Sequence, residues 1–599
     1  MASQTRRTTD SGTVVLHLVL VISFFVLLFT GLRIATDDPS SKWLAFLDPL
    51  LPMEHIWFRH LVAALVFAAT LLGYAVYLIR ARLTARVRLD GARLAAIRRR
   101  GSARWAACNT LVYWGLMVCF AVEIVTGTML FFGADHVYLH IHLSTHWACL
   151  ALVCLHIGFH AAAGGLGQLT RVLKPATLVM APPPPDLAEL LAEQLSLRED
   201  MALRKKPALA TPPAPPKPNR PETLNAHPAA TALAVATAFS FGALGLEQTT
   251  RPILIVAEIR AAEAPVLDGD LSDPVWTKAT PSTIMTSQGG DFGGTGQSQV
   301  EVRAVHDGIF AYFAFTWTDP TRSLKHLPLV KTASGWQLAT NPHDDTEGSQ
   351  FYEDKFSLLL ARSTLPLIGA AIHLSAAPRK DRPPSGTGRG MHYTPDGSIA
   401  DVWVWRASHG GPNGHVDNAH FAGAREPNED ESVGRKRYTA GFALDPGPLA
   451  YRQNMAARLP SDTGSAVLPL RLPRDPGATS RALGRVSDTT DQSDSNDARW
   501  WTTEADTVAY SKAADDKIPA GTVIPNVIMT GADEGTSDTI RGAAHWAAGR
   551  WTLEVARRLY TGSSYDVPIK TGTLMWVAAF DHSESRHTRH LRPLSLEVE

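Results

Sequence analysis

The sequence predicts a membrane-embedded all-α four-helix bundle, with one extra transmembrane helix, followed by an all-β sandwich domain. Two observations lead to this fold class. The N-terminal part contains predominantly apolar stretches of about 20 residues, the length that a helix needs to cross a bilayer. From about residue 253 the pattern changes to short alternating segments that Gly, Pro and Asp separate, as is typical of strands. The formal net charge of zero gives no indication of nucleic-acid binding.

Five apolar stretches are predicted to span the membrane, and they cover residues 14–33, 60–79, 110–132, 140–162 and 229–246. The segment 80–104 holds nine arginines, and the linker 176–228 is Pro-rich and basic. Because Lys and Arg accumulate in cytoplasmic loops, we expect a cytoplasmic N-terminus and an exported C-terminal domain. The expected domains are the bundle (1–175), the linker (176–228), the fifth transmembrane helix (229–246) and the exported sandwich (253–599).

The clearest strand signal in the C-terminal region is a hairpin around Asp307-Gly308. Alternating residues 299–306 precede this dipeptide and the aromatic-rich run 309–317 follows it, which is the strongest short-range pattern for a β-hairpin. Further strands are expected at residues 355–361, 400–406, 551–560 and 573–580. All four cysteines lie at or before residue 154, so no disulfide is expected in this domain.

Histidines recur at the ends of the predicted spans. His17 and His60 begin the first and second spans, and His142 and His156 lie at opposite ends of the fourth. Fourteen helical residues correspond to about 21 Å and return to nearly the same helix face. Ionisable residues inside a bilayer are costly and usually mark a function. One helix thus offers an imidazole at each of two depths, as two stacked haem groups require, with His17 and His60 supplying the opposite ligands.

Two further features of the bundle leave alternatives open. His146 and His160 have the same fourteen-residue offset and form a rival pair on the fourth span. Glu123 lies inside the third span, where a carboxyl group acts either as a proton relay at a quinone site or as a structural hydrogen-bond partner. The chain contains no C-x-x-C-H motif, so any haem is expected to be bound non-covalently.

The bundle resembles the four-helix cytochrome b561 superfamily, which includes the cytochrome b subunits of formate dehydrogenase and hydrogenase. The resemblance covers about residues 10–175 and rests on His17 followed by Thr30-Gly31, on His60, on Thr126-Gly127, and on His142 with His156. It implies that His17, His60, His142 and His156 ligate the iron of two haem b groups. It also implies a location in the bacterial inner (cytoplasmic) membrane.

The C-terminal region resembles the haem-binding domain of the ethylbenzene dehydrogenase γ-subunit family, also seen in dimethylsulfide dehydrogenase. The residues that carry this resemblance are 266–276, 351–355 and 401–406. The resemblance implies a sandwich that holds a third haem b, with iron ligation by Met and Lys. Here Arg406 follows the Trp-x-Trp motif, and Arg cannot lose a proton to bind iron. The candidate ligands are therefore Lys355, His373, Met391 and His392, with His373 plus Met391 or His392 preferred.

Two other features of this region bear on its fold. Trp403 and Trp405 alternate on one strand and face either a haem pocket or the core. The D-G-x-x-x-D-x-x-W pattern that begins at Asp268 also resembles carbohydrate-binding sandwiches, which supports the fold rather than a function.

Together these features predict a membrane-bound b-type cytochrome, an electron-transfer oxidoreductase subunit. It would pass electrons between the quinone pool, as diffusible substrate, and an exported redox protein or molybdenum-type dehydrogenase or reductase subunit. One alternative is a transmembrane ferric or small-molecule reductase. Another is a membrane-anchored ligand-binding sandwich without haem in the exported domain.

Overall fold

The computed structural model describes residues 5–35, 43–44, 46, 56–134, 136–170, 173, 176–179, 226–339, 351–362, 373–375, 391–394, 396–410, 414–432, 438–447, 449–456, 465–484, 493–531, 540–584 and 586–599. The chain divides into two compact units. One unit contains Met1–Leu27, Ala63–Ile124 and Ser144–Ala243, and the other contains Leu28–Val62, Val125–Leu143 and Leu244–Glu599.

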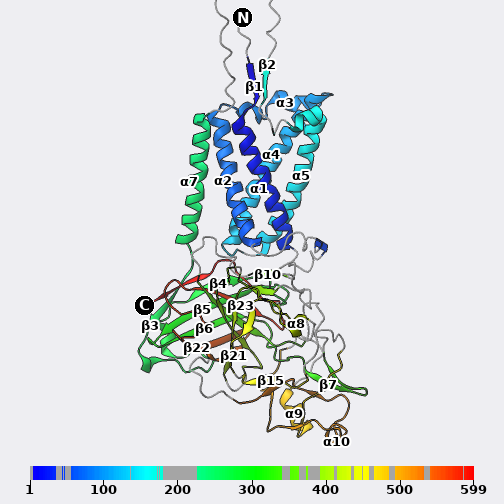
Figure 1. Cartoon of the computed structure of the whole chain (residues 1–599), viewed down its shortest axis with the longest axis vertical. Helices are drawn as coiled ribbons and strands as arrows, with labels where there is room; N and C mark the ends of the chain where they lie inside the picture. The colour runs from blue at the N-terminus through cyan, green and yellow to red at the C-terminus, as the bar shows by residue number, and fades with distance from the viewer. Residues whose placement is uncertain are drawn as a thin grey trace, which may run out of the picture. The chain divides into compact units, whose positions relative to one another are not determined.

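Five helices in the described chain are long and apolar enough to cross a membrane (Figure 1). They are α1 (Ser11–Ala35), α2 (Ile56–Arg80), α4 (Ser102–Phe131), α5 (His136–Leu169) and α7 (Ala226–Thr249). The five predicted spans are therefore confirmed. Each helix is longer than its predicted window, although α4 extends it only at the N-terminal end. A short helix, α3 (Gly91–Ala96), lies in the arginine-rich segment between α2 and α4.

Small and capping residues hold the helices α1, α2 and α7 together. Asp10 caps α1, because its Oδ1 accepts the Thr13 N–H at 2.6 Å, and the same atom accepts the Tyr77 hydroxyl of α2 at 3.0 Å. Gly73 of α2 lies so close to α7 that a Cβ there would be 3.0 Å from the carbonyl oxygen of Ala232. Such close approach through small residues is typical of helix packing in membranes.

One twelve-stranded sheet forms the C-terminal domain. Its strands are β3 (Ile253–Glu258), β4 (Ser282–Thr286), β5 (Ser298–His306), β6 (Phe310–Thr318), β9 (Lys355–Ala361), β12 (Ala400–Arg406), β13 (His415–Phe421), β14 (Phe442–Leu444), β21 (Ile540–Ala547), β22 (Arg550–Arg558), β23 (Leu574–Phe580) and β24 (Leu594–Val598). The order is β12-β9-β23-β24-β3-β5-β6-β22-β21-β13-β14, and β12 also pairs with β13, which closes the sheet into a barrel. The all-β prediction is confirmed, and the sandwich is a barrel whose opposite walls face each other.

The hairpin at Asp307-Gly308 is confirmed as β5 and β6, which pair antiparallel with His306 opposite Ala311. Asp307 Oδ1 accepts the backbone N–H groups of Ile309 and Phe310 at 2.9 and 2.7 Å. Gly308 has a φ of +88°, a conformation that a side chain would disfavour. The turn residues thus set the register of the two central strands.

The barrel interior is filled by aromatic side chains from opposite walls. Trp317 of β6 lies 4.6 Å from Phe356 of β9 and 5.9 Å from Trp405 of β12, measured between ring centroids. Trp403 of β12 packs edge-on against Phe313 of β6, with 5.8 Å between ring centroids. Only 2% of Trp403 and 5% of Trp405 is exposed, so both tryptophans belong to the core rather than to an open haem pocket.

Shorter elements surround the barrel. They are β7 (Leu329–Thr332), β8 (Gly335–Leu338), β10 (His373–Ser375), β11 (Met391–Tyr393), β15 (Tyr451–Gln453), β16 (Arg471–Pro473), β17 (Thr502–Thr503), β18 (Thr507–Ala509), β19 (Val523–Ile524) and β20 (Val527–Met529), with the helices α8 (Glu429–Ser432), α9 (Pro476–Leu483) and α10 (Lys512–Asp515). Leu329, Trp336, Leu472 and Ile524 form a second, smaller core between these elements.

Candidate functional site

Two candidate haem ligands, His60 and His142, each contact a threonine hydroxyl. His60 Nδ1 lies 2.9 Å from Thr30 Oγ1, and His142 Nδ1 lies 2.9 Å from Thr126 Oγ1. When Nδ1 carries the ring proton and donates it to the hydroxyl oxygen, Nε2 keeps the lone pair that an iron ligand needs. Gly127 follows Thr126, and a Cβ there would be 3.3 Å from His142 Cε1. The glycine therefore leaves room beside the His142 ring.

The other two candidates, His17 and His156, are half-buried and share an unusual feature. The Nδ1 atom of each ring is buried and has no hydrogen-bond partner among the described residues. The three imidazoles of His17, His156 and His160 lie within electrostatic range of one another. Because a buried polar atom without a partner is costly, these rings fit a site completed by a group that the polypeptide does not supply.

The rival ligand pair of α5 has different surroundings. His160 Nε2 lies 3.0 Å from Asn109 Nδ2 of α4, and because the amide donates, the Nε2 lone pair is engaged. His146 packs edge-on against Trp147, with 6.2 Å between ring centroids. The Asn109 contact sets the surroundings of His160 apart from those of His156, and the choice of the ligand pair on α5 stays a prediction.

Glu123 is half-buried on α4 and lies within electrostatic range of Cys149 on α5. Its proximity to α5 is compatible with a proton relay and with a structural hydrogen-bond partner. Its role as a relay stays a prediction.

The preferred ligands of the β domain lie on one pair of adjacent strands. Strands β10 and β11 pair antiparallel, which places His373 opposite Tyr393, Leu374 opposite His392, and Ser375 opposite Met391. The side chains of His373, Met391 and His392 lie outside the described part of the structure. Their role as haem ligands therefore stays a prediction.

Lys355 and Arg406, which the family pattern also singled out, are engaged in ion pairs. Lys355 is buried on β9, and its Nζ lies 2.9 Å from Glu584 Oε2 and donates to the Glu584 backbone oxygen at 2.8 Å. Burial lowers the pKa of Lys355. Arg406 Nε lies 3.1 Å from Asp417 Oδ2. The position after the Trp-x-Trp motif thus holds a half-buried cation with its own carboxylate.

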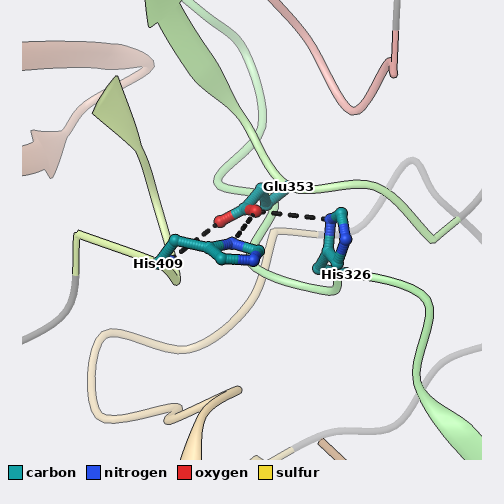
Figure 2. A group of neighbouring side chains, drawn as sticks. All are labelled: His326, Glu353 and His409. Carbon is teal, nitrogen blue, oxygen red and sulfur yellow. Dashed lines mark hydrogen bonds and ion pairs between the residues drawn. The ribbon is translucent and has the colours of Figure 1, made fainter. Parts of the chain in front are cut away.

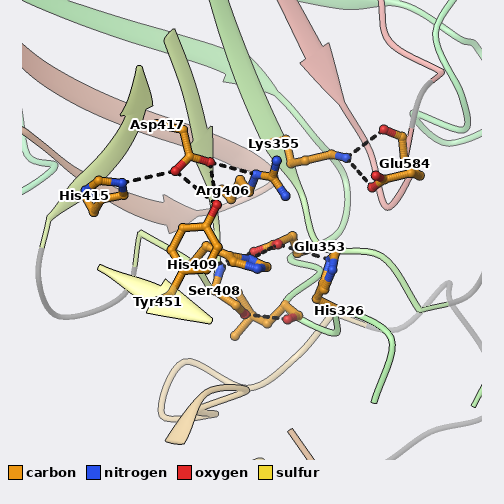
Figure 3. Close-up of polar contacts among 11 residues, drawn as sticks. His326, Glu353, Lys355, Arg406, Ser408, His409, His415, Asp417, Tyr451 and Glu584 are labelled. Carbon is orange, nitrogen blue, oxygen red and sulfur yellow. Dashed lines mark hydrogen bonds and ion pairs between the residues drawn. The ribbon is translucent and has the colours of Figure 1, made fainter. Parts of the chain in front are cut away.

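A buried cluster that no sequence pattern indicated is formed by His326, Glu353 and His409 (Figure 3). Lys355 pairs in register with Arg406, so the chain before β9 and the chain after β12 lie side by side and bring Glu353 close to His409. Glu353 lies within the motif 351–355, but no spacing in the sequence links it to the two histidines. Only the pairing of distant strands reveals the cluster.

Burial dominates the electrostatics of this cluster. His326, Glu353 and His409 are 5%, 0% and 2% exposed. Burial, and secondarily His409, lowers the pKa of His326 to about 3. Burial alone would raise the pKa of Glu353, but His409 and His326 outweigh it and hold that pKa below its ordinary value. These directions favour an ionised carboxylate and a neutral His326 in the cluster.

A second group of acidic side chains, Asp319, Asp354 and Asp581, is also buried near the start of β9. Burial, and then the neighbouring carboxylates, raises the pKa of Asp354 to about 8 and that of Asp319 well above its ordinary value. Asp354 accepts the Ser323 N–H at 2.7 Å and the Trp551 indole N–H at 3.1 Å. The raised pKa values favour the protonated forms of Asp319 and Asp354 over a cluster of three charges.

The helices and the barrel define an integral membrane protein with an appended β domain, and the match to a cytochrome family makes it a b-type cytochrome of electron transfer. Comparison with known families agrees. Residues 8–176 match the prokaryotic cytochrome b561 family, and residues 273–592 match the family described as ethylbenzene dehydrogenase. The chain belongs to this ethylbenzene dehydrogenase family, fused to a cytochrome b561 domain that implies haem b in the membrane. No curated protein matches the chain.

Solved structures similar to the β domain are distant. A putative carbohydrate-binding protein from Bacteroides uniformis is 7% identical, with 58% of this chain and all of that chain covered and a TM-score of 0.24. A family 9 carbohydrate-binding module from Caldicellulosiruptor kristjanssonii, in complex with glucose, is 9% identical, with 58% of this chain and 95% of that chain covered and a TM-score of 0.20. At these scores the similarity carries no argument about function.

Proposed function

We propose that this cytochrome transfers electrons between the quinone pool and an exported redox partner, through two bis-histidine haem b groups. His60 and His142 would hold one haem, and His17 and His156 would hold the other. The observation that carries the proposal is the pair of matching Thr–His contacts, each 2.9 Å long, at His60 and His142. Haem iron, when bound, supplies a one-electron carrier.

The contribution of the polypeptide is to orient and bury the ligands. The hydroxyls of Thr30 and Thr126 hold His60 and His142 in one ring orientation and one tautomer. Asn109 engages His160 and so leaves His156 as the ligand on its part of α5. Glu123, half-buried within the bundle, would carry protons for quinone chemistry.

The nine arginines of residues 80–104 support a cytoplasmic location of that segment in a bacterium, so the N-terminus would be cytoplasmic and the β domain periplasmic. We assign a third haem b to the β domain, held by His373 with Met391 or His392 of the β10–β11 hairpin. The partner would be a periplasmic redox protein or a molybdenum-type dehydrogenase or reductase subunit.

The test is the ratio of haem b to protein in the purified full chain and in single His→Ala variants. We expect three haems in the wild type and the loss of one in the variants of His17, His60, His142 or His156. The matched control, His146→Ala, should keep all three. The ligand assignment fails if the variants of His17, His60, His142 and His156 keep full pigment, and two haems in the wild type would remove the haem from the β domain.

The role of quinone needs a separate measurement. A soluble quinol analogue should reduce the haems of the purified protein, and Glu123→Gln should slow this reduction while leaving the haem content unchanged. If quinol leaves the haems oxidised while a ferric chelate re-oxidises dithionite-reduced protein, the chain is a quinone-independent reductase.

A further inference from the structure

Three potential metal ligands point toward one another in the β domain (Figure 2). Nδ1 of His326, Nδ1 of His409 and Oε1 of Glu353 all lie within 4.8 Å of one another. His326 Nδ1 is 3.3 Å from Glu353 Oε1, and His409 Nδ1 contacts the same oxygen. Each of these three atoms is buried, and none makes a hydrogen bond of normal geometry within the described chain.

The backbone fixes the orientation of the carboxylate. Glu353 Oε2 accepts the N–H groups of Ser408 and His409 at 2.5 and 3.2 Å, which turns Oε1 toward the two imidazoles. The Ser408 hydroxyl donates to the Leu324 carbonyl oxygen at 2.5 Å and ties the loop of His409 to the segment of His326. The three ligand atoms are therefore preorganised by elements that bind one another.

Aromatic rings form the walls around the imidazoles. The Tyr451 ring lies 4.3 Å from the His409 ring, and the Tyr352 ring lies 5.9 Å from the His326 ring, measured between centroids. The rings of His326 and His409 are themselves 4.6 Å apart and nearly perpendicular, at 87°. Rings packed in this way cannot rotate freely, so both Nδ1 atoms stay directed at Glu353.

The nearby cations are already used (Figure 3). Arg406 pairs with Asp417, with 3.1 Å between Nε and Oδ2, and Lys355 pairs with Glu584, with 2.9 Å between Nζ and Oε2. Glu353 is completely buried, and a buried carboxylate is costly unless a positive charge compensates it. A cation held among Glu353 and the two imidazoles would provide that charge.

We propose that His326, Glu353 and His409 bind a divalent first-row transition metal ion, with Zn²⁺ the ion that the donor set suits best. Tetrahedral Zn²⁺ with bonds of about 2.0–2.1 Å separates its ligand atoms by about 3.3 Å. The distance between His326 Nδ1 and Glu353 Oε1 has this value. The contact between His409 and Glu353 is closer and opens when the ion enters. Three protein ligands leave one position for water or a fourth group.

This metal site goes beyond the proposed electron transfer and does not depend on it. Its rival is a metal-free cluster in which a protonated His409 pairs with Glu353. The two differ in what they need, because an ion pair requires only His409 and Glu353, whereas a metal site also requires His326.

The experiment measures Zn²⁺ binding by the tag-free, chelator-treated full chain, using equilibrium dialysis and elemental analysis. We expect the wild type to bind one equivalent of Zn²⁺ tightly. The affinity for Zn²⁺ should fall about 100-fold or more in His326→Ala and Glu353→Gln, because the loss of a residue that only hydrogen-bonds to a metal ligand already lowers metal affinity about 10- to 100-fold. The matched control is His420→Ala, which removes a buried histidine whose Nδ1 lies 2.6 Å from Asp445 Oδ1. It should bind Zn²⁺ like the wild type.

A second measurement protects the test against a variant that fails to fold. X-ray absorption at the zinc edge of the loaded wild type should show imidazole scattering and N/O ligands at about 2.0–2.1 Å. Removal of Zn²⁺ should lower the melting temperature of the wild type, and re-addition should restore it. The proposal is overturned if the wild type binds no equivalent of Zn²⁺, if His326→Ala binds it as tightly as the wild type, or if the bound zinc lacks imidazole ligands.

Discussion

Replacement of Thr126 by valine should weaken haem binding at His142 without changing the packing of α4. Valine has nearly the volume of threonine, so the change removes only the hydroxyl that lies 2.9 Å from His142 Nδ1. A buried donor left without its acceptor costs about 1–3 kcal/mol. Because about 1.4 kcal/mol corresponds to tenfold, the haem affinity should fall about 10- to 100-fold, the range typical for partners of metal-bound histidines.

The assay is haem transfer from the purified full chain to excess apomyoglobin, with a redox titration of the remaining pigment. Thr126→Val should release one haem faster and shift its midpoint potential, and Thr30→Val should affect the same haem through His60. Thr231→Val is the matched control, because its hydroxyl donates to the His227 carbonyl oxygen and to no imidazole. Unchanged release and potential in both Thr126→Val and Thr30→Val would refute the reasoning.

Two further predictions concern the β domain of the full chain. His590 accepts the Val577 N–H at Nε2 (3.0 Å) and donates from Nδ1 to the Arg592 carbonyl oxygen (2.7 Å), and burial lowers its pKa from 6.5 to about 4. The unfolded chain therefore binds this proton more readily, so the free energy of unfolding should fall by up to roughly 3 kcal/mol as the pH is lowered from about 6.5 to about 4. In urea titrations followed by tryptophan fluorescence, His590→Gln should flatten this dependence on pH. An unchanged dependence would contradict the assignment. Trp317→Ala should destabilise the barrel by about 3–5 kcal/mol in the same assay, because its buried ring stacks 4.6 Å from Phe356, and a loss below about 1 kcal/mol would contradict that core position.

The candidate haem ligands show where prediction from sequence ended. Depth along the helix is a local property, so His17, His60, His142 and His156 could be placed near span ends from spacing alone. The choice between His156 and His160 could not be made in this way, because both repeat the same offset. Only the position of Asn109 on a neighbouring helix distinguishes them.

The β domain shows the same division more strongly. The motif 351–355 contained Glu353, but its histidine partners lie far away in the chain and carry no pattern of their own. The alternation at Trp403 and Trp405 was compatible with a pocket or a core, and burial by the opposite wall decided for the core.

By itself, the sequence determined the five membrane helices, the Asp307-Gly308 hairpin and half of the twelve barrel strands. These features depend on the length of apolar runs and on local turn chemistry, which neighbouring residues specify. Only the tertiary structure decided that β12 pairs with β13 to close the barrel and that His326, Glu353 and His409 meet. Both depend on pairing between segments far apart in the chain, and such pairing follows from the packing of the whole domain rather than from any local pattern.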